Sequence, residues 1–321
     1  MSLPESLVNK MSLPLIGAPM FIISNPRLVI EQCRAGIIGS FPALNARPQS
    51  LLDDWLAEIS EGLAEPSDTP IAPFAVNQIC HPSNARLEQD VMSCVKHRVP
   101  VVITSLSPPA EIVQAVHSYG GMVFHDVINV RHAKKAAAQG VDGLILVAAG
   151  AGGHAGTLSP FALVQEVREW FDGIIILSGS IASGEAVAGA LAMGADLAYS
   201  GTAFIATEEA NADPEYKQML VESAASDITY SSLFTGVHGN YLTPSISRAG
   251  LDPNNLPEGD KESMNFEKLS GGSKAWKDIW GAGQGLGAIE NIQPTAKLVE
   301  KLSHEFKGSL NQLANSKWMN D

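Results

Sequence analysis

The feature of this sequence that most restricts its fold is a series of three short apolar runs between Gly143 and Thr202, each followed at once by a turn rich in glycine or serine. The runs cover residues 144–149, 174–177 and 197–199, and the turns cover residues 150–156, 178–180 and 200–202. Runs that are apolar throughout, rather than at alternate positions, are typical of strands buried on both faces of a parallel sheet. The chain is therefore predicted to be an α/β protein.

The second and third turns predict a site for a phosphate group. Glycine at the end of a strand lets backbone N–H groups approach a ligand closely, and a Ser/Gly/Thr turn that leads into a helix favours anions. One such turn is weak support, because short glycine patterns recur by chance as ordinary strand-to-helix turns. Two turns on consecutive strands favour a phosphate-bearing cofactor held by Ser178, Gly179, Ser180, Ser200, Gly201 and Thr202.

The first turn, Gly152-Gly153-His154-Ala155-Gly156, places an imidazole among glycines at the end of a strand. Histidine ionises near neutral pH and can therefore act as a base, an acid or a hydrogen-bond donor. A solvated histidine in a glycine turn is the simpler interpretation. The two phosphate-type turns nearby favour the interpretation that His154 is catalytic, and we expect the chemistry to take place beside it.

Eight predicted strands alternate with predicted helices along the chain. Besides the three runs above, the strands cover residues 15–20, 37–40, 74–79, 101–105 and 122–127. A spacing of about 20–35 residues per unit is typical of βα repeats, and eight units close into a (β/α)8 TIM barrel. An open doubly wound sheet is the alternative. The barrel is favoured because the phosphate-type turns follow strands seven and eight, where many barrels bind phosphate.

The rhythm of strands and helices stops after Thr202. We predict a barrel over residues 1–212, an inserted lid or extra layer over 213–290, and a C-terminal helix over 291–321 that completes the barrel. The region 230–284 is rich in Gly, Pro, Asn and Ser, and such long irregular stretches are often functional lids. Trp276 and Trp280, next to a glycine-rich segment, either close over a ligand or anchor the lid to the barrel.

Charge and cysteine content exclude several classes of function. With 21 Lys and Arg against 34 Asp and Glu, the net charge is −13, which argues against binding to nucleic acid or to an anionic membrane surface. Three cysteines without metal-ligand spacing argue against a disulfide framework or a zinc site. The N-terminus has no signal-peptide pattern and no apolar run is long enough to span a bilayer, so we expect a cytoplasmic enzyme without a metal.

Two polar residues on predicted strands are further candidates. Asn77 lies inside the third strand, where it either satisfies a backbone group in the core or points into the barrel mouth and bonds the edge of a heteroaromatic ring. His125 lies near the end of the fifth strand. It is either a packed core histidine or a donor to a cofactor's ring or ribityl group.

Together these residues resemble the nitronate monooxygenase family, whose members, also known as 2-nitropropane dioxygenases, are FMN-dependent (β/α)8 barrels. The matching features are Ala18-Pro19-Met20, Asn77, the segment 151–156, and both phosphate-type turns. The similarity spans most of the chain, including residues 276–287. Flavin-dependent enoyl reductases of fatty-acid synthesis share segment 151–156 and both turns, and are the closest competing family.

The resemblance implies a role for each matching residue. Ala18, Pro19 and Met20 would line the flavin ring, and Asn77 and His125 would bond its edge or its ribityl chain. Gly152 and Gly153 would pass close to the cofactor, and the two turns would hold its phosphate. His154 would be the catalytic residue. Related sequences often carry a lysine at the position of His125 and an acidic or amide residue near Val147, which is where this sequence departs from them.

The resemblance also implies the reaction. We expect an FMN-dependent oxidoreductase that oxidises alkyl nitronates with O2 to a carbonyl compound and nitrite. The alternative activity is an NAD(P)H-dependent flavin reduction of enoyl thioesters or quinones, and the alternative class is a non-catalytic flavin-binding or phosphate-binding protein. The expected partners are a small-molecule substrate and O2. The oligomeric state that the resemblance allows is a homodimer.

Overall fold

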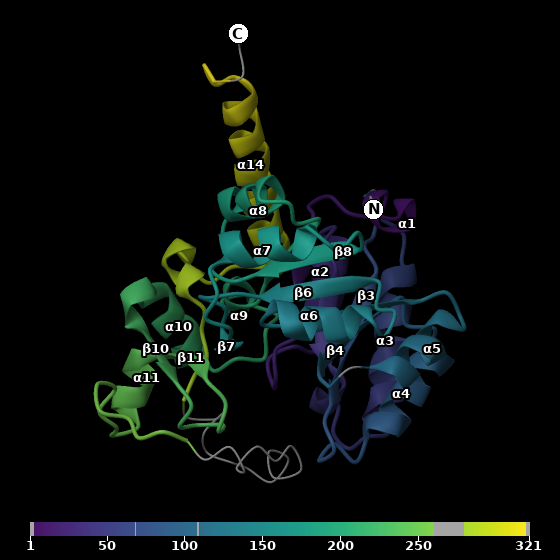
Figure 1. The fold of residues 1–321 in the computed structure, drawn as a ribbon, viewed down its shortest axis with the longest axis horizontal. Helices are drawn as coiled ribbons and strands as arrows, with labels where there is room; N and C mark the ends of the chain where they lie inside the picture. Colours follow the sequence, from purple (N-terminus) through teal and green to yellow (C-terminus); the bar gives the residue numbers. More distant parts are fainter. Residues whose placement is uncertain (1–2, 68, 108, 260–278, 319–321) are drawn as a thin grey trace.

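A closed ring of eight parallel strands forms the centre of the computed structural model, which describes residues 3–67, 69–107, 109–259 and 279–318 (Figure 1). The strands are β1 (Leu15–Gly17), β2 (Gly39–Pro42), β3 (Phe74–Cys80), β4 (Val101–Leu106), β5 (Met122–Val127), β6 (Gly143–Val147), β8 (Ile174–Ser178) and β9 (Leu197–Ser200). Their order is β1-β9-β8-β6-β5-β4-β3-β2. The two ends of this order meet, because Ile16 of β1 forms a parallel bridge with Ile38, just before β2. The predicted (β/α)8 barrel is thus confirmed, and the open doubly wound sheet is excluded.

The outer layer consists of helices that connect successive strands. They are α2 (Pro26–Arg34), α3 (Leu51–Ala64), α4 (Leu87–Lys96), α5 (Ala110–His117), α6 (Val130–Ala137), α7 (Pro160–Arg168) and α8 (Gly184–Ala192). Asn25, Asn129 and Ser183 cap three of these helices, each accepting a hydrogen bond from the N–H three residues later. Such caps satisfy N–H groups that have no partner within the helix. They therefore fix the residue at which each of these three helices begins.

The helix after β9, α9 (Thr202–Ile205), has only four residues. The long C-terminal helix α14 (Thr295–Ala314) instead packs against α8 and α2 and covers that side of the barrel (Figure 1). The contact with α8 is close, because a Cβ on Gly184 would overlap the Leu302 carbonyl oxygen. Glu305 accepts a hydrogen bond from the Gly184 N–H at 2.8 Å. The C-terminal turns of α14 project away from the barrel.

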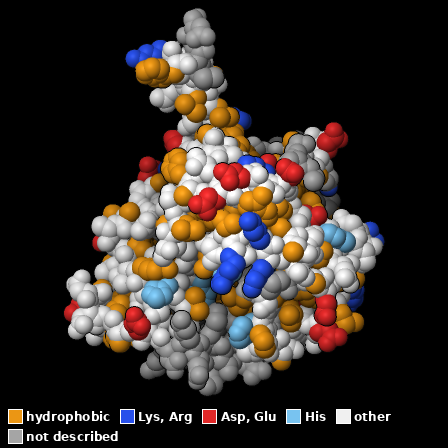
Figure 2. Space-filling model, viewed as in Figure 1, with side chains coloured by type: hydrophobic (Ala, Val, Ile, Leu, Met, Phe, Trp, Pro, Cys, Tyr) orange, Lys and Arg blue, Asp and Glu red, His pale blue; other side chains and the backbone are white. Residues whose placement is uncertain are grey.

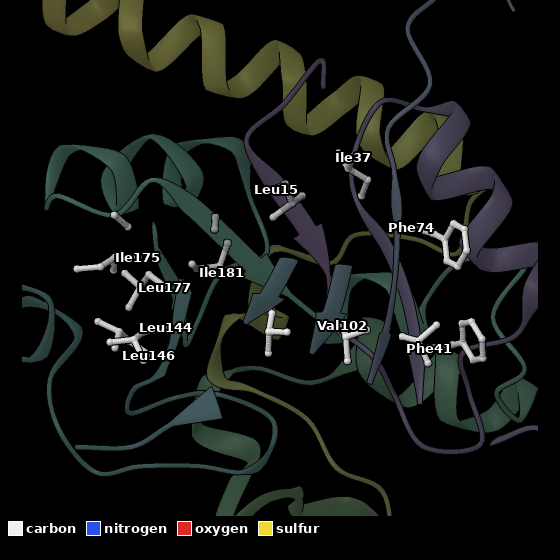
Figure 3. Close-up of a cluster of buried hydrophobic side chains, with 14 of the residues drawn as sticks. Leu15, Ile37, Phe41, Phe74, Val102, Leu144, Leu146, Ile175, Leu177 and Ile181 are labelled. Atoms are coloured by element: carbon white, nitrogen blue, oxygen red, sulfur yellow. The ribbon is translucent and has the colours of Figure 1, made fainter. Parts of the chain in front are cut away.

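Side chains on the strands alternate between two apolar layers. One layer packs between strands and helices and includes Phe41, Val102, Leu144 and Ile175 (Figure 3). The other fills the barrel interior and consists mainly of Ile16, Ile38, Ala75, Val101, Ile103, Phe124, Ile145, Ile174, Ile176, Leu197 and Tyr199. The parity of a residue along its strand therefore decides whether its side chain faces the barrel interior or the helices.

An added layer lies beside the carboxyl ends of the strands (Figure 1). It contains α10 (Pro214–Glu222), β10 (Ile228–Ser231), β11 (Gly239–Leu242) and α11 (Thr243–Arg248). Antiparallel pairing joins β10 to β11, and β11 to the two-residue strand β7 (Gly153–His154). The sequence predicted the helix at α10, over residues 213–225, but only an irregular stretch over 230–284, where the structure has β11 and α11. The sheet escapes sequence patterns because its strands are short and because β7 comes from a glycine turn some 80 residues earlier.

The remaining short elements are helix α1 (Glu5–Val8) and the 3-10 turns η1 (Ala43–Asn45), η2 (Ala225–Asp227) and η4 (Gln284–Ala288). Most strand boundaries differ from the predicted ones by one to three residues; in particular, β1 ends at Gly17 instead of residue 20, and β2 begins at Gly39 instead of residue 37. The stretch Ala18-Pro19-Met20 is therefore a loop at the end of β1, which places its side chains beyond the barrel core.

Candidate active site at the barrel mouth

A cavity of about 1270 Å³ opens at the carboxyl ends of the strands, between the barrel and the added layer. Ten of the predicted site residues line it: Ala18, Pro19, Met20, Asn77, Gly152, Gly153, His154, Ser178, Gly201 and Thr202. The added layer contributes Phe234, Val237 and Trp280 to the wall. Ligand sites commonly measure 300–1,000 Å³, so this cavity has room for a cofactor together with a second molecule.

Three residues of the predicted phosphate turns shape the turns without lining the cavity. The Ser200 hydroxyl donates to the Ile181 carbonyl at 2.7 Å, and the Ser180 N–H donates to the Gly150 carbonyl at 3.2 Å. Gly179 has φ of +133°, and a Cβ there would lie 2.7 Å from the Ala149 carbonyl oxygen. Only glycine fits this backbone, so the turn after β8 depends on the residue that the sequence pattern singled out.

His125 occupies a different place from the one expected. It lies on the face of β5 shared with Val123 and Val127, which belong to the layer between strands and helices. Its Nδ1 is 2.8 Å from the Thr104 hydroxyl, and the side chain is 3% exposed. Burial lowers the pKa of His125 to about 4. His125 is therefore a neutral, packed histidine and does not line the cavity, which is the first of the two interpretations that the sequence allowed.

The neighbouring residue Asp126 faces the barrel interior and lines the cavity in its place. It ends a chain of hydrogen bonds across three adjacent strands. The Asn77 amide donates to the Ser105 hydroxyl at 2.8 Å, and the Ser105 hydroxyl donates to Asp126 Oδ2 at 2.6 Å. Asn77 thus lies at the mouth, which is the second of the two interpretations that the sequence allowed, and there it also holds Ser105 in position.

Asp126 has no counter-charge in the described part of the chain. Its Oδ1 atom is buried and forms no hydrogen bond there, and none of the ion pairs between described residues includes it. Burial raises the pKa of Asp126 to about 6, and the Ser105 hydrogen bond opposes that rise. The sequence showed an acid near the end of this strand, but with apolar residues on both faces of β5, alternation could not show which one reaches the mouth.

His154 is held in the added sheet and still faces the cavity. Residues 153 and 154 pair with Asn240 and Gly239 of β11. The Asn240 side chain donates to the Ala151 carbonyl at 2.6 Å, and this bond fixes the turn that leads into β7. The sequence predicted a histidine in a glycine turn. The structure shows that this turn is one edge of the sheet that covers the mouth.

The hydrogen bonds around His154 define its tautomer. Thr235 donates its hydroxyl proton to the Val237 carbonyl at 2.9 Å, so the Thr235 oxygen accepts from His154 Nε2, which lies 2.9 Å away. The proton is then on Nε2, and Nδ1 carries the lone pair. Burial lowers the pKa of His154 to about 4, so the imidazole is neutral at pH 7. A neutral imidazole with an unprotonated nitrogen has the form of a general base.

A glycine-rich strap, which we define as residues 280–286, packs on the turns after β6 and β9. The Gly283 N–H donates to the Thr202 hydroxyl at 2.9 Å, and the Gln284 N–H donates to the Gly150 carbonyl at 2.9 Å. A Cβ on Gly152 would lie 2.8 Å from the Gly283 nitrogen. Backbones can approach this closely only where both residues lack a side chain.

Trp280 anchors this strap. Its ring stacks on Tyr216 of α10, with centroids 4.8 Å apart, and the Arg248 guanidinium lies 3.7 Å from the Trp280 ring centre. The Tyr216 hydroxyl donates to the Gly281 carbonyl. Trp280 is 5% exposed and contributes to the cavity wall, so it is both an anchor and part of the site. Trp276, the other predicted aromatic, lies outside the described residues.

Across the described ranges, no three His, Cys, Asp or Glu side chains are grouped so that they could hold a metal ion. The same residues include no helix that is long and apolar enough to cross a membrane. The polar groups at the mouth are instead hydrogen-bonding side chains and backbone turns, which suit an organic ligand. Fold and site together define a (β/α)8-barrel enzyme with its active site at the carboxyl ends of the strands.

Comparison with known proteins assigns the family. A sequence profile of the nitronate monooxygenase family matches residues 41–305. The nitronate monooxygenase of Paraburkholderia phytofirmans is 27% identical, with 94% of each chain covered. The Neurospora crassa nitronate monooxygenase is also 27% identical, over 93% of this chain and 90% of that one. The chain belongs to the nitronate monooxygenase family. It is an oxidoreductase, and its family implies a flavin cofactor.

Solved structures with the same fold include a nitroalkane oxidase from Streptomyces ansochromogenes. It superposes with a TM-score of 0.80 at 22% identity and covers 95% of this chain and 99% of that one. FabK from Thermotoga maritima also has a TM-score of 0.80, at 24% identity, over 95% of this chain and 96% of that one. At these identities the two likenesses support the barrel fold alone.

Proposed function

We propose that this chain is an FMN-dependent enzyme that oxidises small alkyl nitronates with O2 to a carbonyl compound and nitrite. The observation that carries the proposal is that a neutral histidine, His154, lines the same cavity as the Gly201 turn. FMN would supply the electron transfer, and the protein would supply position and electrostatics. The three cysteines are buried free thiols, which supports a reducing, cytoplasmic setting.

The residues at the mouth fit a flavin phosphate. Gly201 has space beside it, since a Cβ there would be 3.4 Å from the nearest atom, Ala18 Cβ. Ser178 and Thr202 line the cavity, and their hydroxyls can bond phosphate oxygens. On β5, which only β6 separates from β8 in the barrel, Asp126 keeps a buried oxygen without a partner among the described residues, as expected where a polar ligand group belongs. FMN has a phosphate at one end and a polar ring at the other.

His154 would lie beside the nitro group of the substrate and accept at Nδ1 the α-proton of a neutral nitroalkane, which then becomes the nitronate; a substrate supplied as the nitronate has already lost that proton. Thr235 fixes the proton on Nε2, so the imidazole needs no rearrangement before it acts as a base. The added layer contributes Phe234, Val237 and Trp280 to the wall. These side chains would exclude water from the site, which strengthens electrostatic interactions inside it.

The proposal is tested with purified protein loaded with FMN. Anaerobic mixing with propyl-2-nitronate should bleach the flavin absorption, and admission of air should restore it with release of nitrite. With neutral 2-nitropropane as the substrate, His154→Asn should retain the flavin spectrum and lose most of the nitrite production, by about 10²–10⁴-fold if His154 acts as a general base. Unchanged turnover in His154→Asn would refute the assigned role.

A second candidate function is the NAD(P)H-dependent reduction of thioesters or quinones. The basic side chains at one edge of the cavity favour it. His132 of α6 lies at that edge, and the same helix carries Arg131, Lys134 and Lys135. Figure 2 shows Lys and Arg side chains gathered over α6, on a chain with a net charge of −13. A local basic surface attracts anionic ligands, and both NADPH and a phosphate-bearing thioester are anions of this kind.

Anaerobic reduction distinguishes the two candidates. Rapid bleaching by NADH or NADPH, together with a higher KM for NADPH in Lys134→Gln/Lys135→Gln, would favour the reductase. Slow bleaching by both nucleotides and fast bleaching by the nitronate would favour nitronate oxidation.

A further inference from the structure

We propose that Asp126 acts as a hydrogen-bond donor to the bound flavin, in the protonated form, with its proton on Oδ1. This inference rests on the proposed FMN site and assigns to it a residue that the family resemblance did not include. Asp126 lies at the mouth on β5, and the phosphate-type turns follow β8 and β9. A flavin held by its phosphate at those turns would extend its ring towards β3, β4 and β5.

The hydrogen-bond chain fixes where the proton of Asp126 resides. Asn77 donates to Ser105, and Ser105 in turn donates to Asp126 Oδ2. Oδ2 is therefore already an acceptor, and a proton on the carboxyl group belongs on Oδ1. Oδ1 is buried and has no hydrogen-bond partner among the described residues. A buried polar atom without a partner destabilises the folded protein, and a ligand acceptor would remove that cost.

The surroundings of Asp126 favour the neutral acid. The ionisable neighbours that interact with it are Tyr199 on β9 and Cys80 on β3, and both are neutral because burial raises the pKa of each. His154, which also lines the cavity, is neutral as well. Burial already raises the pKa of Asp126 to about 6. A flavin that displaces water from the mouth would desolvate the carboxyl group further and raise that pKa again.

The test is the dissociation constant of FMN, measured by quenching of flavin fluorescence between pH 5 and pH 8. If binding raises the pKa of Asp126, FMN binds more weakly as the pH rises, by about tenfold for each pKa unit. Asp126→Asn keeps a donor at every pH. It should match the wild type at pH 5 and bind FMN about tenfold more tightly than the wild type at pH 8.

Two controls isolate Asp126. The FMN phosphate has its own ionisation near pH 6, but it is the same in both proteins and cancels in the ratio of their dissociation constants. Asp54→Asn, an exposed acid on α3, should leave the pH dependence unchanged. Ser105→Ala removes the hydrogen bond that lowers the pKa of Asp126, so the inflection should move to higher pH.

The outcomes separate this inference from the proposed function. A ratio that does not vary with pH, or a variant that binds FMN more weakly than the wild type at pH 8, would overturn the role of Asp126 as a donor. An inflection that stays in place in Ser105→Ala would also overturn it. A wild-type protein that fails to bind FMN at every pH would instead refute the proposed FMN site.

Discussion

The turn after β8 gives a prediction whose size follows from the structure. Gly179→Ala places a methyl group 2.7 Å from the Ala149 carbonyl oxygen, on a backbone with φ of +133°. A non-glycine residue in such a region costs about 1–3 kcal/mol. Overlap with a backbone oxygen that has no flexible side chain to move costs about 1–3 kcal/mol more. We therefore expect the variant to lose about 2–6 kcal/mol, a large part of a typical stability of about 5–15 kcal/mol.

The assay is urea unfolding without cofactor, followed by circular dichroism. Gly189→Ala is the matched control, because Gly189 is an exposed residue inside α8 with no atom within 4 Å of the added Cβ. This control should gain about 0.5–1 kcal/mol, the helix propensity difference between glycine and alanine. A Gly179→Ala variant within 1 kcal/mol of the wild type (about the smallest strain expected) would contradict the account of the turn.

Three further predictions concern the mouth and the strand that leads to it. Gly201→Ala should fold with near-normal stability, because its Cβ has 3.4 Å of clearance, yet weaken FMN binding measured by fluorescence; unchanged affinity would remove this turn from the phosphate site. Thr235→Val should lower the turnover of neutral 2-nitropropane by about tenfold or more through loss of the His154 tautomer, and Thr235→Ser should restore it; equal rates in both variants would show that the hydroxyl has no such role. His125→Gln should leave FMN affinity unchanged, because His125 faces the helices. It should also flatten the acid side of the stability profile. The pKa of His125 is about 4 in the folded protein and 6.5 in the reference state, so the unfolded chain binds more protons between these values and stability rises with pH there. An unchanged slope between pH 4 and 6.5 in urea titrations would refute this burial argument.

The sequence predicted the barrel because each strand is a compact apolar run and each helix has ordinary start and stop signals. The residues of the barrel mouth were predicted where a turn with glycine or histidine follows an apolar run, as at Gly201 and His154. His125 and Asp126 show the limit of this reasoning. The strand around them, residues 122–127, is apolar on both faces. The sequence therefore cannot show whether the odd-numbered or the even-numbered residues face the barrel interior. Only the pairing with neighbouring strands determines it.

The residues that position His154 were also beyond sequence reasoning. Thr235 and Asn240 lie about 80 residues further along the chain, in a segment without regular periodicity. Their contacts depend on β7 and β11 pairing across that distance. Short antiparallel strands carry little pattern of their own, because tertiary contacts rather than local propensity determine them. The strap of residues 280–286 was visible only as a glycine-rich segment, and its contact with Gly150 and Thr202 required the fold.

The central claim is that one cavity brings a flavin phosphate to the turns after β8 and β9 and the imidazole of His154 to the same mouth. A crystal structure of the protein soaked with FMN tests it most directly. We predict density for the phosphate against Ser178 and Gly201, with the ring extending between Asp126 and His154. FMN bound elsewhere on the protein, or crystals that stay colourless after soaking, would contradict the claim.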